Sequence, residues 1–362
     1  MNRTIWEWIA DYLRQAERQG NTLALQMARK HEEAYGHRQS NPQRMYALLA
    51  EGKSLAQQLH EPWWVAFFEH WQIETLIYYL DDYRTVLDRV IALTLELRKP
   101  IFADYPLRFG IYCNLVAAYL CIDPRGHADE IRQALAYLEQ IVPEEGGDRY
   151  LLLARRHWFA YELAEYDEAR RLALEELILA DSDPDSYTAL HHEVDTYKAL
   201  CWVAFRQEDW ASLSRWADLG EEKARQADYR YELALFLLWR ALVALLGGDR
   251  PGAARLHRLA LATMQRIGQA PGESYYDTLA RYAEQAGQLP QAWAIREEEL
   301  RRLIGKGQLA YEAQVRIKRV RLLRLLQRPV TQEQAAARLA IARLRAPQWY
   351  EHELARALQG EG

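Results

Sequence analysis

The stretch HWFAYELAEYDEA, residues 157–169, indicates the fold class because it holds the end of one helix, a short polar turn and the start of another helix. Similar windows begin at Cys201, Ala241 and Ala280, so the four starts are 44, 40 and 39 residues apart. Each window has an alanine three positions after its start and an alanine or leucine early in the following helix. Small residues at these points allow two antiparallel helices to approach closely. The windows therefore predict helix hairpins that must stack on their neighbours to bury their apolar faces.

The rest of the chain has the same helical character. Apolar residues recur at helical spacing, as in DEARRLALEELIL at 167–179, and clusters of glycine and proline separate such segments. Pro251 and Pro290 follow short polar turns, where proline suits the first turn of a helix. We expect about eighteen helices, each of roughly 14–22 residues.

Two segments carry a resemblance to a known family: AYELAEYDEARRLALEEL (160–177) and LVALLGGDRPGAARLHRLAL (242–261). They resemble the tetratricopeptide-repeat superfamily, in particular its long-helix bacterial variants such as the sensor arm of maltose-regulator-type transcription factors. The period here is near 40 residues instead of 34, and the Trp…Leu-Gly…Tyr pattern of the first helix is absent, so a HEAT-like or generic α-solenoid stays an alternative. The resemblance implies an all-α, right-handed superhelix of antiparallel helix hairpins that serves as a binding scaffold. We expect the repeats over 41–329 and capping helices at 1–40 and 330–362, in one continuous solenoid.

The composition limits the functional classes. The chain has 362 residues, 50% of them hydrophobic and 27% charged, which is a globular balance that excludes general disorder. The net charge of −5 gives no overall basic field for nucleic acid. The N-terminal residues lack the apolar core of a secretory signal, and three scattered cysteines do not form a disulfide framework. We therefore expect a cytoplasmic protein that does not insert into a membrane.

No motif predicts catalysis, a cofactor or a metal. The GKG at 305–307 lacks the remaining residues of a phosphate-binding loop. His191 and His192 are adjacent and point about 100° apart on a helix, so we interpret them, with Glu193, as solvated residues instead of metal ligands. Cys201 takes the place of an alanine in its window, which indicates packing. The acids between Glu162 and Glu176 are interpreted as one solvated face.

Aromatic and charged residues on the first helix of each predicted hairpin are candidates for a binding groove. In tetratricopeptide-like repeats this helix lines the concave wall, and large aromatic side chains there suit an extended peptide, a helix or a flat ligand. The alternative is that these rings fill space between helices. The candidates on these helices are Trp158, Tyr161, Lys198, Trp202, Phe205, Arg206 and Arg281. The cluster Trp63, Trp64, Phe67, Phe68 and Trp71 is instead expected to pack the N-terminal hairpins together.

A basic stretch lies near the C-terminus. Residues 301–345 are rich in Lys and Arg and contain only two acids, Glu312 and Glu333. At 100° per residue, Lys318, Arg321 and Arg324 share one helix face. Such a face is expected to contact an acidic partner, to dock on the protein's own acidic helices, or to contact nucleic acid or a membrane surface.

Three hypotheses for function follow. The first is a non-enzymatic protein-binding scaffold, adaptor or regulatory subunit that uses the aromatic groove and the basic C-terminal helix. The second is a regulatory module that senses a small ligand or a peptide. The third is a nucleic-acid-binding solenoid, which the charge balance favours least.

Overall fold

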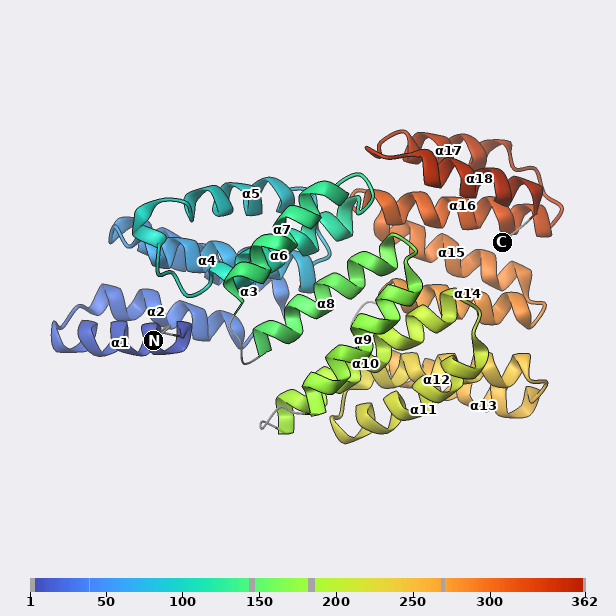
Figure 1. Ribbon diagram of the computed structural model, residues 1–362, viewed down its shortest axis with the longest axis horizontal. Helices are drawn as coiled ribbons and strands as arrows, with labels where there is room; N and C mark the ends of the chain where they lie inside the picture. Colours follow the sequence, from blue (N-terminus) through green and yellow to red (C-terminus); the bar gives the residue numbers. More distant parts are fainter. Residues whose placement is uncertain (1–3, 39, 143–146, 182–185, 268–270, 361–362) are drawn as a thin grey trace. The chain divides into compact units, whose positions relative to one another are not determined.

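The computed structural model describes residues 4–38, 40–142, 147–181, 186–267 and 271–360. Within these ranges the fold is all-helical, with eighteen α-helices, one π-helical segment, one short 3-10 helix and no β-strand (Figure 1). The predicted all-α class and the number of helices are confirmed. Consecutive helices pack against each other along the chain, in keeping with a helical solenoid. None of the helices in these ranges is both long enough and apolar enough to cross a membrane.

The chain divides into two compact units. The N-terminal unit comprises Met1–Ile122, Asp129–Val142 and Gly305–Gly307, and the C-terminal unit comprises Asp123–Ala128, Pro143–Ile304 and Gln308–Gly362. The expected capping helices at 1–40 and 330–362 and the expected repeats over 41–329 stay predictions.

The helices of the N-terminal unit surround an aromatic core. They are α1 (Ile5–Arg18), α2 (Thr22–Tyr35), α3 (Pro42–Gln58), α4 (Pro62–Glu74), the π-helical Thr75–Tyr79, α5 (Val86–Glu96), the 3-10 helix Pro100–Phe102, α6 (Arg108–Ile122) and α7 (Ala128–Ile141). Trp64, Phe67 and Phe68 are fully buried and pack with helices α1 to α3. The aromatic cluster therefore packs the first hairpins together, as the sequence indicates.

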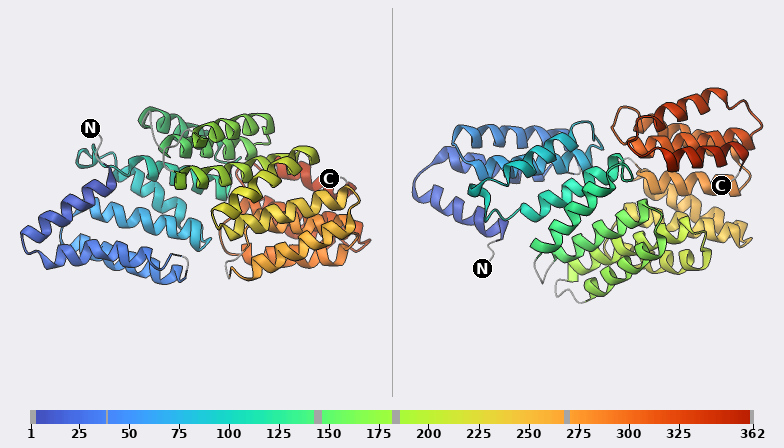
Figure 2. Two further views of the ribbon diagram at one scale, coloured as in Figure 1. Left: turned by 90° about the horizontal axis from the view of Figure 1, so that it is seen from below. Right: turned by 45° about the horizontal axis from the view of Figure 1, so that its top comes forward.

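The C-terminal unit consists of helices that pair in sequence. They are α8 (Gly147–Glu162), α9 (Tyr166–Asp181), α10 (Ser186–Arg206), α11 (Trp210–Gln226), α12 (Arg230–Leu246), α13 (Arg250–Gln265), α14 (Glu273–Gln285), α15 (Leu289–Leu303), α16 (Leu309–Leu325), α17 (Thr331–Ile341) and α18 (Gln348–Gln359). Contacts join the two helices of each hairpin, α8–α9, α10–α11, α12–α13 and α14–α15, and also join α8 to α10, α10 to α12 and α12 to α14 (Figures 1 and 2). The first helices of successive hairpins are thus neighbours.

The four sequence windows correspond to four hairpin turns of one geometry. In each, the backbone N–H that follows the turn donates to the carbonyl of the repeated alanine at 2.8–2.9 Å: Glu165 to Ala160, Asp209 to Ala204, Asp249 to Ala244 and Gln288 to Ala283. The residue just before that N–H is left-handed: Ala164 (φ 65°), Glu208 (φ 54°), Gly248 (φ 86°) and Gly287 (φ 75°). This is the Schellman ending of a helix. The common turn geometry explains why the windows align although their spacing varies from 39 to 44 residues.

The small residues of the windows lie where the paired helices meet. Cys201, Ala241 and Ala280 are at most 1% exposed, as are the early residues Ala169, Leu213, Ala253 and Ala292 of the second helices. His157, the start of the remaining window, is half-buried. Cys201 belongs to the core, and burial raises the pKa of its thiol well above the usual value, so it packs as an apolar side chain.

Enlarging a buried alanine tests this register. Ala241→Leu is expected to lower the free energy of unfolding by about 1–3 kcal/mol, because the added atoms overpack a filled interface. The measurement is thermal denaturation by circular dichroism, with Ala211→Leu as the control, since Ala211 is exposed on α11. An unchanged melting temperature for Ala241→Leu would contradict the register.

Candidate functional site

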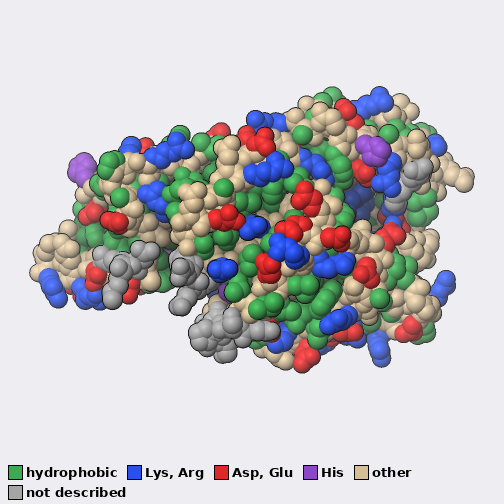
Figure 3. All heavy atoms as spheres, viewed as in Figure 1, with side chains coloured by type: hydrophobic (Ala, Val, Ile, Leu, Met, Phe, Trp, Pro, Cys, Tyr) green, Lys and Arg blue, Asp and Glu red, His purple; other side chains and the backbone are tan. Residues whose placement is uncertain are grey.

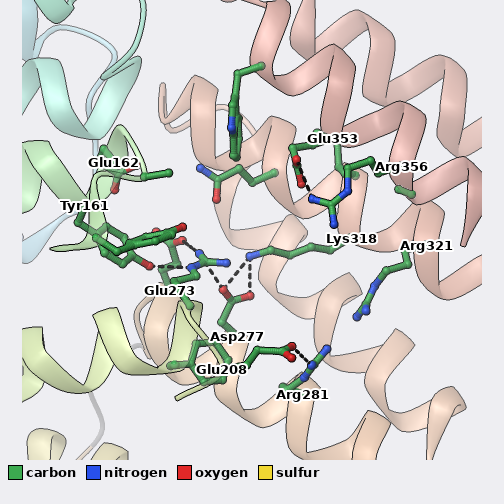
Figure 4. A pocket seen from close by; sticks show the side chains of 18 of the residues that line it. Tyr161, Glu162, Glu208, Glu273, Asp277, Arg281, Lys318, Arg321, Glu353 and Arg356 are labelled. Atoms are coloured by element: carbon green, nitrogen blue, oxygen red, sulfur yellow. Dashed lines mark hydrogen bonds and ion pairs between the residues drawn. The ribbon is translucent and has the colours of Figure 1, made fainter. Parts of the chain in front are cut away.

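A cavity of about 730 Å³ lies within the C-terminal unit. Its walls come from α8, α9, α10, α14, α15, α16 and α18, together with the turn after α6 and the α8–α9 and α10–α11 turns. The lining residues are Arg125, Tyr161, Glu162, Ala164, Tyr166, Phe205, Arg206, Glu208, Glu273, Asp277, Arg281, Glu284, Arg296, Gln314, Ile317, Lys318, Arg321, Trp349, Glu353, Arg356 and Ala357. Charged side chains thus make up most of a wall formed mainly by the first helices of the hairpins (Figure 4).

Asp277 of α14 lies at the centre of the cavity wall and is 3% exposed. Three cations converge on its carboxylate. Lys318 Nζ lies 2.6 and 2.7 Å from the two oxygens, Arg296 Nη1 lies 2.6 Å from Oδ1, and Arg206 Nη2 lies 3.1 Å from Oδ2 (Figure 4). Helices α10, α14, α15 and α16 are therefore joined through one buried carboxylate.

The surroundings of Asp277 shift the pKa values of the cluster. Burial opposes ionisation of Asp277, but Lys318, Arg296 and Arg206 outweigh it and hold the pKa of the carboxyl well below its usual range. Burial also lowers the pKa of Lys318, with Arg206 and Arg296 acting in the same direction and Asp277 against it. Asp277 and the three cations stabilise one another's charged forms, so removing one of them leaves a buried charge without its counter-ion.

Two further carboxyl groups face the cavity and ionise less readily. Burial, together with the neighbouring carboxylates Glu162 and Asp277, raises the pKa of Glu273 to about 8, against the opposing effects of Lys318 and Arg206. Burial raises the pKa of Glu162 as well. Glu162 of α8 accepts a hydrogen bond from Trp158 Nε1 at 3.3 Å. Glu273 Oε1 lies 3.5 Å from Arg206 Nη2, so this carboxyl borders the cations around Asp277.

Ion pairs also organise the other charged residues of the wall. Arg281 pairs with Glu208, Arg321 pairs with Glu284, and Arg356 Nη1 lies 3.2 Å from Glu353. In Figure 4, Glu162 and Glu273 lie on the Tyr161 side, and Arg321 and Arg356 lie on the opposite side. On the face of the molecule that Figure 3 draws, acidic and basic side chains are interspersed, without a large region of one sign.

Aromatic side chains complete the wall. The Tyr161 hydroxyl accepts a hydrogen bond from Arg206 Nε at 2.7 Å, and the Tyr161 ring meets Trp202 edge-on at 5.2 Å. The Arg125 guanidinium lies 4.3 Å from the centroid of the Trp349 ring. Aromatic faces next to cations provide contact area for a ligand at low entropic cost.

The structure brings most of the sequence-predicted residues together and leaves the others outside the cavity. Those that line it are Tyr161, Phe205, Arg206, Arg281, Lys318 and Arg321. Trp158 and Trp202 are half-buried directly behind the wall, in contact with Glu162 and Tyr161. Lys198 pairs with Asp195 on its own helix, at 2.6 Å. Arg324 is exposed on α16 and is not part of the wall.

Two interpretations of surface residues are wrong. Glu162 lines the cavity, and Glu176 is fully buried and paired with His157, so these acids do not form one solvated face. His192 and Glu193 are each 8% exposed, with His192 stacked on Tyr150 and Glu193 bonded to Lys223. Among the residues with described positions, no group of His, Cys, Asp and Glu could hold a metal ion.

Sequence reasoning missed Glu273 of α14 and the contribution of α18. Glu273, Asp277, Arg281 and Glu284 follow one face of α14 at helical spacing, so extending the register from Arg281 towards the N-terminus would have identified Glu273. Trp349 and Arg356 carry no local pattern that indicates a site.

No protein-family model matches the chain, and neither does any curated protein. Function is therefore inferred from the chemistry of the cavity.

Proposed function

We propose that the C-terminal unit is a tetratricopeptide-like solenoid segment that binds an extended segment of another protein, as a non-enzymatic scaffold or regulatory subunit of the cytoplasm. The observation that supports this most is the 730 Å³ cavity, lined by charged and aromatic side chains from the first helices of successive hairpins. A wall of this kind offers hydrogen-bonding groups at several points along its length. Such a wall suits an extended peptide better than a small ligand with one polar group.

Preorganisation of the wall supports the same function. Arg206, Lys318 and Arg296 are held in place by Asp277, and Arg281 and Arg321 by carboxylates of other elements. Side chains that are already fixed lose little entropy on binding, so more of their interaction energy contributes to affinity.

The test is calorimetric titration of the full-length protein with blocked peptides of about ten residues that are acidic, basic, mixed or apolar. We expect at least one class to bind, and Arg321→Glu to change the affinity for a charged peptide at least tenfold, downwards for an acidic peptide and upwards for a basic one. The control is Arg324→Glu on the same helix, because Arg324 lies outside the cavity. The swap Arg321→Glu with Glu284→Arg keeps an ion pair in place and separates loss of binding from loss of folding.

A second candidate function is sensing of a small polar ligand, which the charged lining of the cavity favours. A rise in melting temperature with a small molecule and no peptide would support it, since a ligand that prefers the native state stabilises that state. Failure of every peptide class to bind, or turnover of a substrate by the purified protein, would overturn the peptide-binding proposal.

A further inference from the structure

Several cations share one buried carboxylate at the centre of the cavity. Arg206, Arg296 and Lys318 all pair with Asp277. Arg296 also binds Glu299 at 2.7 Å, and Arg206 also lies 3.5 Å from Glu273. Among the described ion pairs, Lys318 has Asp277 alone, at 2.6–2.7 Å. Burial lowers the pKa of Lys318, and the charges of Arg206 and Arg296 act in the same direction, so an additional anion beside these groups would stabilise the cluster.

Arg125 adds a cation from a different part of the chain. Its turn is fixed within the C-terminal unit by Asp123, which accepts hydrogen bonds from the backbone N–H groups of Gly126 at 3.0 Å and Arg345 at 2.8 Å. The guanidinium stacks on Trp349, its Nε atom is buried without a hydrogen-bond partner, and the structure shows it no ion pair with a described carboxylate. An arginine held in this way provides planar donors that lack an acceptor.

Arg125, Arg206 and Lys318 all line the cavity. They come from the turn after α6, from α10 and from α16, so a ligand in the cavity has cations of three elements around it. None of the three forms an ion pair with Glu162 among the described contacts.

We propose that the cavity binds an acidic segment of a partner protein, with one side-chain carboxylate of that segment held by Arg125, Arg206 and Lys318. This inference rests on the proposed peptide-binding function and names the chemistry of the peptide. Arginine binds a carboxylate through two parallel hydrogen bonds, and a ligand carboxylate gives the cations that share Asp277 a further counter-ion.

The acids of the wall favour a peptide over a nucleic acid. Glu284 and Glu353 remain beside Arg321 and Arg356 and partly neutralise them. A phosphate backbone carries a charge at every nucleotide and would meet these carboxylates, whereas a peptide places neutral residues between its acids. The cavity therefore suits widely spaced negative charges.

Glu273 links this binding to pH. It is faced by Glu162 of α8, Arg206 of α10, Asp277 of its own helix and Lys318 of α16, and its pKa is about 8. Below pH 8 the carboxyl is mostly neutral and does not repel an acidic ligand, while above pH 8 it is an anion. If the protein binds the peptide only while Glu273 is protonated, the affinity falls about tenfold between pH 7 and pH 9, because the protonated fraction falls by that factor.

Calorimetric titration of the full-length protein with three blocked peptides tests the proposal. The peptides alternate serine with glutamate, glutamine or lysine, and their blocked ends leave side-chain carboxylates as the only anions. We expect the glutamate peptide to bind at least tenfold more tightly than the glutamine peptide at pH 7. Arg125→Gln should weaken it at least tenfold, with Arg324→Gln as the matched control. Glu273→Gln, which resembles the protonated acid, should bind at pH 9 as the wild type does at pH 7.

The outcomes separate this inference from the function on which it rests. Equal binding of the glutamate and glutamine peptides, lost in Arg321→Glu, would overturn the acidic preference and leave peptide binding in place. Tighter binding of a short oligonucleotide or of inorganic phosphate than of the glutamate peptide would overturn the acidic-peptide ligand. Absence of binding by all three peptides, in a protein with an unchanged melting temperature, would overturn the acidic-peptide proposal, and failure of the mixed and apolar peptides as well would overturn the peptide-binding function.

Discussion

Asp277→Asn is expected to lower the free energy of unfolding by about 3–5 kcal/mol, the effect of removing one partner from a buried ion cluster. The amide keeps the shape of the side chain but leaves Arg206, Arg296 and Lys318 without their shared carboxylate. The three cations around this buried position then repel one another. Urea denaturation followed by far-UV circular dichroism measures the change.

Acid pH provides a second test of the same residue. The pKa of Asp277 is depressed in the folded state, so its stabilising effect is complete above the unfolded pKa of about 4 and declines as pH falls towards the folded value. The stability difference between wild type and Asp277→Asn is therefore expected to be largest at neutral pH and to shrink below about pH 4.

Two variants distinguish the buried cluster from an ordinary surface pair. Asp218→Asn breaks the ion pair between Asp218 and Arg240, whose side chains are 54% and 36% exposed, and should change stability by less than about 1 kcal/mol. Adding Lys318→Met to Asp277→Asn removes one cation and should restore part of the lost stability. A loss in Asp277→Asn no larger than in Asp218→Asn would show that the three cations do not depend on Asp277.

The helix hairpins could be predicted from the sequence, because the residues that form each turn lie within one short segment of the chain. The repeated alanine accepts the hydrogen bond that ends the first helix, and the left-handed residue follows four positions later, so the pattern and the turn have the same length. The same register placed Phe205, Arg206 and Arg281 on the side where the cavity lies. These positions depend only on helix geometry.

The remaining parts of the site depend on where helices end and on contacts between distant segments. Glu162 and Glu165 look like one acidic face if a single helix runs through them, but α8 ends at Glu162 and α9 begins at Tyr166, so the two acids have different surroundings. The stacking of Arg125 on Trp349 joins residues more than two hundred positions apart. No periodic pattern encodes such a contact.

A second repeated feature, visible only in the structure, concerns glycine and phenylalanine. Gly220 of α11 lies against the ring of Phe236 of α12, and a Cβ atom added at Gly220 would lie 2.3 Å from two of its ring carbons. Gly52 of α3 and Phe68 of α4 are related in the same way, with a Cβ approach of 2.4 Å. Both phenylalanines are fully buried. The glycine precedes the phenylalanine by sixteen residues in both units, so the same glycine–phenylalanine contact joins α3 to α4 and α11 to α12.

Phe236→Ala is accordingly expected to destabilise the protein by about 3–5 kcal/mol through loss of buried contacts and the cavity that remains. Gly220→Ala is expected to cost about 1–3 kcal/mol by overpacking the same contact. Because the two residues touch, Gly220→Ala combined with Phe236→Leu should destabilise less than the sum of the single changes. The midpoint of urea denaturation measures each effect, and Gly36→Ala is the control, since its nearest neighbours would lie 3.5 Å or more from a new Cβ. Additive single changes, or a Gly220→Ala variant as stable as Gly36→Ala, would show that this contact does not determine how α11 approaches α12.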